Sequence, residues 1–190
     1  QGAELIGTGD MGIGNTTPSS AIAAVMTGAD VARVTGRGTG ITEAAHAHKV
    51  AVVQQALAVN RPDPTDPLEV LAKVGGYEIA GLVGIMLASA RAHRPLVLDG
   101  FISGAAALIA VGLEPRLKDY LIASHLSQEP GHRVILDYLG LTPLLDLNLR
   151  LGEGTGAALA MPILEAACAV LTQMATFEEA GVAQRSSSPP

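Results

Sequence analysis

The sequence contains no tryptophan, and aromatic residues of all kinds make up only 3% of its 190 residues. A hydrophobic share of 48% with 16% charged residues excludes an intrinsically disordered chain, so we expect a core built from aliphatic side chains. The single cysteine, Cys168, excludes a disulfide within the chain and is typical of a reducing compartment, which predicts a cytoplasmic location.

The sequence also lacks any cluster of lysine and arginine, and its formal net charge is −6. A nucleic-acid-binding surface is normally basic, so we expect no nucleic-acid partner. No basic segment leads into an apolar run, which argues against a signal peptide. The longest apolar stretch, residues 157–171, is interrupted by Pro162 and Glu165. We interpret it as too short and too broken to span a bilayer and expect no membrane partner.

Short apolar runs alternate with helical segments along the chain. Residues 5–6, 95–98 and 120–123 are predicted strands, which are followed by a glycine-rich turn, by Asp99-Gly100 and by Ser124-His125. This alternation is typical of an α/β, Rossmann-like three-layer fold with a mostly parallel sheet flanked by helices. Ligands in such folds bind beyond the carboxyl ends of the strands. We therefore expect an α/β core over residues 1–156, a long helical segment over 157–182 and a disordered tail over 183–190.

The first glycine-rich loop matches a dinucleotide fingerprint through Gly7, Gly9 and Gly12, with Asp30 about 20 residues downstream. In that motif, however, the helix begins inside the glycine run. Here Thr17 and Pro18 predict a later start, with Thr17 as the N-cap. A dinucleotide-dependent oxidoreductase is therefore the weaker alternative, although the loop's backbone N–H groups could still face an anion.

Other polar residues suggest anion binding rather than metal binding. Lys49 follows a second glycine loop around Gly38 and could neutralise a phosphate, or it could be an ordinary solvated residue. Ser127 could cap a helix or contact a phosphate. His46 and His48 face different directions on a helix, and Cys168 lies in an apolar helix that predicts a core position. We therefore expect no metal and no cofactor.

Glu153 lies between Gly152 and Gly154, just before the long apolar helix. The two glycines leave room for a flat ligand to approach the backbone. Apolar surroundings would raise the pKa of this carboxyl group and suit it to acid–base catalysis near neutral pH. The alternative is a simple acid that stabilises the first turn of the helix.

Four segments together resemble one enzyme family over residues 5–182. They are residues 9–17 (GDMGIGNTT), residues 97–101 (VLDGF), the pair Ser124 and His125, and residues 150–160 (RLGEGTGAALA). This pattern resembles the nicotinate-nucleotide–dimethylbenzimidazole phosphoribosyltransferase family (CobT-like), and the last segment is the most specific. The resemblance implies transfer of ribose 5-phosphate from nicotinate mononucleotide to 5,6-dimethylbenzimidazole, which gives α-ribazole 5′-phosphate and nicotinate during assembly of the cobalamin (vitamin B12) nucleotide loop.

The resemblance also implies roles for individual residues. Glu153 would be the general base that removes the benzimidazole N–H proton. The pyridinium charge makes nicotinate a good leaving group, so the reaction needs no metal. Asp10 stands where the family usually has glutamate and would have a secondary role near the ribose. The residues expected to line the substrate sites are Gly12, Gly38, Lys49, Asp99, Gly100, Ser127, Leu151 and Gly152, with Met161 as a further contact of the base.

Members of this family carry a substantial segment before the Gly-Asp-Met-Gly loop, whereas this chain begins with Gln1. The resemblance therefore implies that the chain is the carboxy-terminal portion of a homodimeric enzyme and that its last helix belongs to a small helical domain. It leaves an alternative of a different kind: the chain could bind nucleotide without catalysing the reaction, because part of the base pocket would be missing.

Overall fold

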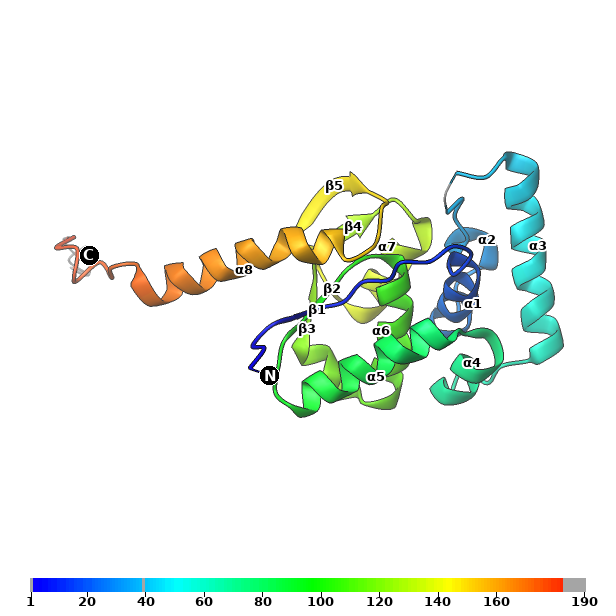
Figure 1. Cartoon of the computed structure of the whole chain (residues 1–190), viewed down its shortest axis with the longest axis horizontal. Helices are drawn as coiled ribbons and strands as arrows, with labels where there is room; N and C mark the ends of the chain where they lie inside the picture. Colours follow the sequence, from blue (N-terminus) through cyan, green and yellow to red (C-terminus); the bar gives the residue numbers. More distant parts are fainter. Residues whose placement is uncertain (1, 39, 183–190) are drawn as a thin grey trace, which may run out of the picture.

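The computed structural model describes residues 2–38 and 40–182. The tail expected to be disordered, residues 183–190, lies outside the described residues. The chain order of the elements is shown in Figure 1. The strands are β1 (Ile6–Gly7), β2 (Leu96–Leu98), β3 (Leu121–Ala123), β4 (His125–Ser127) and β5 (Leu145–Leu149). The helices are α1 (Thr16–Thr27), α2 (Val31–Val34), α3 (Glu43–Asn60), α4 (Pro67–Val74), α5 (Tyr77–Arg91), α6 (Phe101–Leu113), the 3₁₀ helix η1 (Pro115–Tyr120), α7 (Pro130–Leu139) and α8 (Thr155–Gln173).

The main sheet consists of three parallel strands in the order β1-β2-β3, with Leu96 of β2 opposite both Ile6 and Leu121. Strands β4 and β5 form a separate parallel pair with an irregular register. The predicted α/β class with parallel strands is confirmed. The predicted strands at residues 5–6, 95–98 and 120–123 fall on β1, β2 and β3, whereas β4 and β5 are additional.

Helices cover both faces of this sheet, as the three-layer prediction requires (Figure 1). Side chains alternate between the two faces of a strand. On β2, Leu96 and Leu98 join the main hydrophobic core with α5 and α6. Val97 faces the other way and packs with Ala157 and Ala160 of α8. The start of α8 is therefore held against the sheet, and the loop that precedes it is brought to the strand ends.

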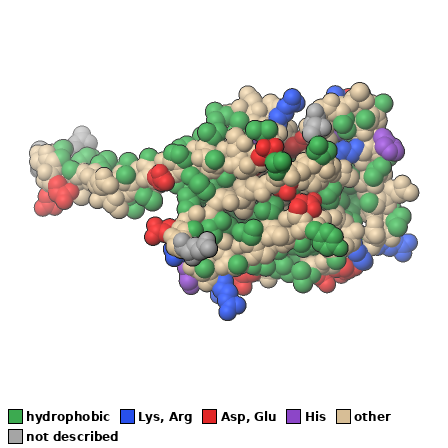
Figure 2. All heavy atoms as spheres, viewed as in Figure 1, with side chains coloured by type: hydrophobic (Ala, Val, Ile, Leu, Met, Phe, Trp, Pro, Cys, Tyr) green, Lys and Arg blue, Asp and Glu red, His purple; other side chains and the backbone are tan. Residues whose placement is uncertain are grey.

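The rest of α8 projects from the body as an arm, and hydrophobic side chains lie along it (Figures 1 and 2). The helix begins at Thr155 and ends at Gln173, short of the end of the predicted helical segment at residue 182. It is unbroken by Pro162, and of the described residues it alone forms a helix long and apolar enough to cross a membrane. The interpretation of this stretch as too short and broken is therefore wrong, although one such helix is weak evidence for a membrane span.

Cys168 also lies on this arm and is exposed, so the expectation that it is buried in the core is wrong.

At the other end of the chain, α1 begins at Thr16 with Asn15 as its N-cap, so the predicted cap at Thr17 is wrong by two residues. Helix α3 is capped by Thr42, whose side chain accepts a hydrogen bond from the backbone N–H of Ala45. The start of α1 still lies beyond the glycine run, as the sequence argument required.

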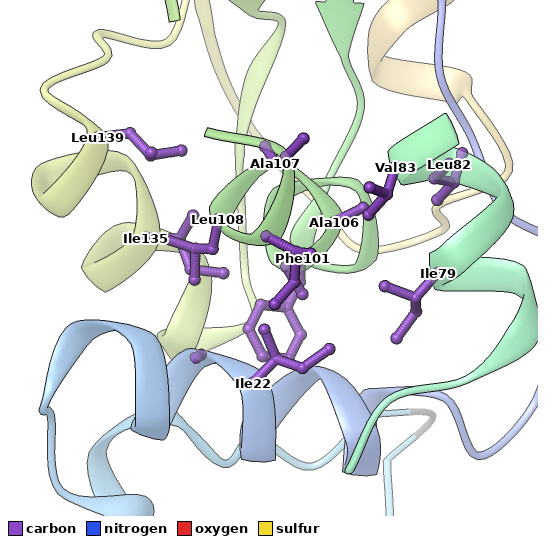
Figure 3. Packing of buried hydrophobic residues seen from close by; sticks show 14 of the residues in the cluster. Ile22, Ile79, Leu82, Val83, Phe101, Ala106, Ala107, Leu108, Ile135 and Leu139 are labelled. Carbon is purple, nitrogen blue, oxygen red and sulfur yellow. The ribbon is translucent and has the colours of Figure 1, made fainter. Parts of the chain in front are cut away.

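Helix α6 lies at the centre of the main core and is buried along most of its length (Figure 3). Its side chains pack against Ile22 of α1, Ile79 of α5 and Ile135 of α7. Full burial of an aliphatic side chain of this size stabilises the fold by ~1.5–3 kcal/mol. Small residues on α6, chiefly Ala105, Ala106 and Ala107, allow the neighbouring helices to approach closely.

His132 of α7 is the most deeply buried ionisable side chain near the strand ends. Its Nδ1 atom accepts a hydrogen bond from the backbone N–H of Ser127 at 3.0 Å, and its Nε2 atom has no hydrogen-bond partner among the residues that the structure describes. Burial, reinforced by His125 and Arg133, lowers the pKa of His132 to about 3. The imidazole is therefore neutral in the folded protein over the physiological pH range.

This burial predicts acid sensitivity of the fold. Because the pKa is lower in the folded state, the unfolded state binds more protons between pH 6.5 and 3, and stability falls as the pH drops through that window. Between pH 6 and 5, proton binding to His132 in the unfolded state should lower the free energy of unfolding by roughly 1 kcal/mol. Urea unfolding at the two pH values should show a smaller loss for His132→Gln than for the parent protein. The control His48→Gln, at an exposed position, should retain the parent's loss; an equal loss in all three proteins would contradict the assignment.

Candidate active site

The carboxyl ends of the three parallel strands point toward one region of the molecule. Strand β1 leads into the glycine loop that begins at Thr8, β2 into Asp99 and Gly100, and β3 into Ser124. Parallel sheets place ligands at this end because the loops that follow adjacent strands meet there. Two clefts adjoin this region, and they meet at Asp10, which lines both.

The first cleft has a volume of about 350 Å³. It gathers most of the residues that the sequence predicted for substrate binding, although they come from six separate places in the chain. Those that line it are Asp10, Gly12, Gly38, Lys49, Gly100, Ser127, Leu151 and Gly152. The structure therefore brings these residues together, with Leu151 in this cleft rather than in the one that contains Met161.

Lys49 places a partly buried cation at one end of the first cleft. Its Nζ atom donates hydrogen bonds to Thr16 Oγ1 at 2.7 Å and to the carbonyl oxygen of Gly36 at 3.1 Å. Burial lowers the pKa of Lys49, and the nearby Glu129 carboxylate opposes that shift. Since Thr16 begins α1, the ammonium group lies beside a helix N-terminus, and both features favour an anion.

Gly38 closes the same end of the cleft through its backbone conformation. Its φ angle is +54°, and an added Cβ would lie 3.1 Å from Thr16 Oγ1 and 3.8 Å from Lys49 Nζ. A side chain here would be strained and would crowd the atoms that surround the candidate anion site. The second glycine loop therefore lies against Thr16 and the Lys49 ammonium group at this end of the cleft.

Sequence reasoning missed other residues that line the first cleft. They are Ile13, Gly14, Asn15, Thr16, Thr17, Arg37, Ile41, Phe101, Ile102, His125, Glu129 and Arg150. A signal for three of them was present, because the run Asn-Thr-Thr immediately precedes or begins a predicted helix. The others come from the two glycine loops, the start of α6, the β4 region and the segment after β5, which only the tertiary fold brings together.

Asp10 separates the two clefts. Its carboxylate accepts a hydrogen bond from the Asn15 side-chain amide, and its carbonyl oxygen accepts one from the Glu153 backbone N–H at 3.1 Å. These contacts join the first glycine loop both to the start of α1 and to the loop before α8. Asp10 is therefore the point at which ligands in the two clefts would come closest.

The second cleft, of about 480 Å³, contains Glu153. Its apolar lining comes from Met11, Ala157, Ala158 and Met161, and its remaining lining residues are Gly7, Thr8, Gly9, Asp10 and Gly154. Glu153 is exposed to solvent in this chain. The expected apolar neighbours, Ala157, Ala158 and Met161 of α8, do line the same cleft, but the Glu153 side chain itself is exposed rather than buried among them.

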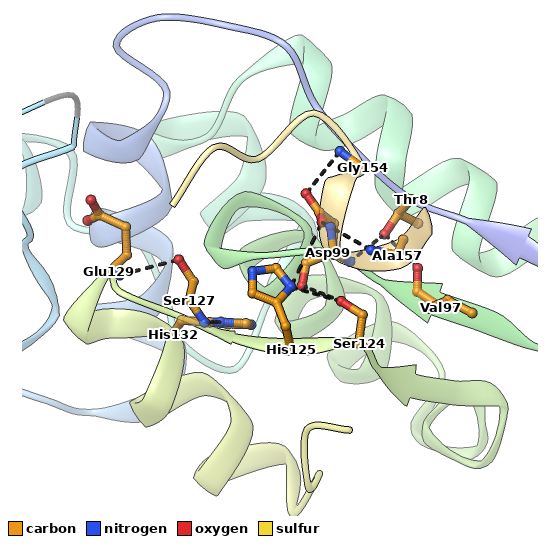
Figure 4. A network of polar contacts seen from close by, with 11 residues as sticks. Thr8, Val97, Asp99, Ser124, His125, Ser127, Glu129, His132, Gly154 and Ala157 are labelled. Atoms are coloured by element: carbon orange, nitrogen blue, oxygen red, sulfur yellow. Dashed lines mark hydrogen bonds and ion pairs between the residues drawn. The ribbon is translucent and has the colours of Figure 1, made fainter. Parts of the chain in front are cut away.

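Asp99 lines neither cleft, contrary to its predicted place in the pocket wall. It is 3% exposed and lies behind the first cleft. Its carboxylate accepts hydrogen bonds from the backbone N–H groups of Gly154, Gly156 and Ala157 (Figure 4). The residue is thus engaged by the protein itself and is not available to a substrate.

His125 reaches the first cleft from β4 although it is almost fully buried. Its Nδ1 atom lies 2.9 Å from Ser124 Oγ and 3.9 Å from the Asp99 carboxylate. Burial lowers the pKa of His125, and the Asp99 carboxylate partly offsets that effect. The ring packs directly on Gly156, where an added Cβ would lie only 1.9 Å from Nδ1.

The remaining sequence candidates lie outside both clefts. The Asp30 carboxylate accepts a hydrogen bond from the Ala32 backbone N–H at 2.7 Å and caps α2, so it does not face a ribose site. His46 contacts the Thr35 carbonyl oxygen and His48 is exposed. Within residues 2–38 and 40–182, no group of three or more potential metal ligands comes together.

Comparison with known proteins places this geometry in a family. A family model described as phosphoribosyltransferase matches residues 1–182. Two curated relatives named nicotinate-nucleotide–dimethylbenzimidazole phosphoribosyltransferase, from Desulforudis audaxviator and Geobacter sulfurreducens, are 63% and 60% identical. Each alignment covers 97% of this chain and 52% of the relative, so the chain spans about half the length of these relatives.

A solved structure gives the same result in three dimensions. The crystal structure of CobT from Thermus thermophilus superimposes with a TM-score of 0.92 at 54% identity, over 97% of this chain and 55% of that one. Both the sequence and the arrangement of the elements are therefore shared. The chain belongs to the phosphoribosyltransferase family that this model describes.

Proposed function

We propose that the protein containing this chain transfers ribose 5-phosphate from nicotinate mononucleotide to 5,6-dimethylbenzimidazole in cobalamin biosynthesis. The observation that carries the proposal is the junction of two clefts at Asp10, one with a cation beside a helix N-terminus and one with a carboxylate above an apolar wall. The names of the relatives support the same reaction. Because the chain spans about half of them, the activity is proposed for the whole protein.

The first cleft is the proposed site of the nucleotide donor. Lys49 and the N-terminus of α1 would hold the 5′-phosphate, since an ammonium group and the positive end of a helix dipole both favour a dianion. Gly100 and Ser127, further along the cleft, would face the ribose. Asp10 would then lie near C1′, where it has a secondary role through its position between the clefts.

The second cleft is the proposed site of the acceptor base. Met11, Ala157 and Met161 offer an apolar surface to a flat aromatic ring, and Glu153 would accept its N–H proton. The other ring nitrogen attacks C1′, which forms the new C–N bond with inversion from β to α. The bond from C1′ to the nicotinate nitrogen breaks, and its electron pair neutralises the pyridinium charge.

The same proposal includes the setting in which the enzyme works. We propose a cytoplasmic homodimer that uses no metal or cofactor, with residues 1–156 as the nucleotide-binding core and residues 157–182 as part of a small helical domain. The exposed apolar side chains of α8, such as Ile163 and Leu171, support this arrangement because such residues normally pack against protein.

The role of Glu153 is tested by Glu153→Gln in the intact protein. The amide cannot accept the proton, so kcat for α-ribazole 5′-phosphate formation should fall ~10²–10⁴-fold while the KM for nicotinate mononucleotide changes little. Product formation can be followed by liquid chromatography. Glu165→Gln, at an exposed position on α8, is the matched control and should keep the parent rate. A Glu153→Gln rate within threefold of the parent would remove the base assignment.

The role of Lys49 is tested by Lys49→Met, which keeps the length of the side chain and removes its charge. Losing a hydrogen bond to a charged phosphate costs ~1.5–3 kcal/mol, so the KM for nicotinate mononucleotide should rise roughly 10–100-fold. The KM for the base should stay nearly constant, because Lys49 does not line the second cleft. Lys73→Met, on α4, is the control. Equal changes in both KM values would show that the cation does not act on the donor.

A second candidate function applies to the 190-residue chain by itself. The first cleft already holds the Lys49 ammonium group with its polar partners, whereas Glu153 in the second cleft is exposed. The chain alone would then bind nicotinate mononucleotide without turnover. Isothermal calorimetry on the isolated chain should show saturable binding that Lys49→Met abolishes, with no nicotinate released when base is added. Nicotinate release at the rate of a full-length relative would rule out this candidate.

A further inference from the structure

We propose that Asp99 is a positioning residue for Glu153, and that its carboxylate sets the reaction rate by fixing the loop before α8. The inference rests on the proposed function, because it assigns a consequence to the place of Glu153. It differs from the role that the sequence suggested for Asp99, since this residue lines neither cleft.

The Asp99 carboxylate caps α8 from a distance of more than fifty residues along the chain. Oδ2 accepts a hydrogen bond from the Gly154 N–H at 3.0 Å, and Oδ1 accepts from Gly156 and Ala157 at 2.8 and 3.3 Å. Helix N-termini present N–H groups that need such partners. The N-cap residue, Gly154, has no side chain to supply one. A buried carboxylate therefore performs the capping that the local sequence cannot.

Asp99 is itself held by the strands on either side (Figure 4). Its backbone N–H donates to Thr8 Oγ1 at 3.3 Å, and the same hydroxyl donates to the Val97 carbonyl oxygen at 3.2 Å. The Asp99 carbonyl oxygen accepts a hydrogen bond from Ser124 Oγ at 3.3 Å. The carboxylate is thus anchored to the three-stranded sheet, and the loop before α8 is fixed relative to the sheet.

The loop needs this support because its backbone is unusual. Gly152, Glu153 and Gly154 have φ angles of +75°, +59° and +78°, so three consecutive residues adopt the left-handed conformation. This conformation is unfavourable for Glu153, which carries a side chain, and it persists only where neighbouring contacts impose it. Besides the Asp99 bonds, the Glu153 N–H donates to the Asp10 carbonyl oxygen at 3.1 Å. Asp99 and Asp10 therefore determine where the Glu153 side chain leaves the loop.

Replacement of Asp99 by asparagine tests the idea with little change in size. One carboxylate oxygen becomes an NH₂ group, which repels the backbone N–H it faces, and the negative charge at the helix N-terminus is lost. In the intact protein, Asp99→Asn should lower kcat about 10–100-fold and leave the KM for nicotinate mononucleotide within threefold. Asp146→Asn, an exposed acid on β5, is the matched control and should keep the parent kcat.

A double-mutant cycle separates positioning from general stability. If Asp99 acts through Glu153, adding Asp99→Asn to Glu153→Gln should lower kcat by less than twofold further. Independent, multiplying effects would overturn the positioning role, and so would an unchanged kcat in Asp99→Asn. If Glu153→Gln itself has no effect, the proposed function fails, whatever Asp99→Asn does.

Thr8→Val provides a second variant if Asp99→Asn does not fold. It keeps the shape of the side chain and removes the hydroxyl that holds the Asp99 backbone, so kcat should fall severalfold in the parent and not in Glu153→Gln. Circular dichroism and thermal melting would establish that each assayed variant is folded. An unchanged kcat in folded Thr8→Val, or failure of both variants to fold, would assign Asp99 to stability alone and overturn the proposal.

Discussion

Burial of one continuous stretch, from β2 into α6, is the constraint on which the rest of the structure depends. Both faces of β2 and nearly every side of α6 are covered by other elements, so almost nothing in this stretch faces solvent. Aliphatic burial of this kind is the main favourable term in folding. A chain with few aromatic residues can achieve it because alanine and glycine on α6 let neighbouring helices approach closely. The turn after β2 is therefore fixed in space before any ligand is present.

Asp99 interrupts this apolar stretch, and its burial has a cost unless its oxygens are satisfied. The backbone N–H groups at the start of α8 satisfy them, which couples a polar requirement of the core to the placement of a distant loop. The same turn supplies Gly100 to the donor cleft. Core and site are thus connected through two consecutive residues, and the geometry of both clefts follows from the register of one strand.

The sequence allowed prediction of the parallel strands and of the glycine loops that follow them, because apolar runs and glycines are local signals. The pair β4 and β5 could not be found this way. Leu145 and Leu149 of β5 are only half-buried, Leu147 is exposed and Asn148 is left-handed, so no clear alternation marks the strand. The exposure of Glu153 was misjudged for a similar reason, since apolar neighbours in the sequence do not show whether the side chain itself faces solvent.

The contact between Gly156 and His125 has a consequence for how the gene can vary. Any codon change at position 156 that alters the amino acid adds at least a Cβ, and that atom would overlap the imidazole ring. Alanine, the smallest possible replacement, already carries this Cβ, so any single substitution of Gly156 produces the overlap. A larger residue at position 156 therefore requires a companion change that shrinks residue 125, more than thirty positions away in the sequence.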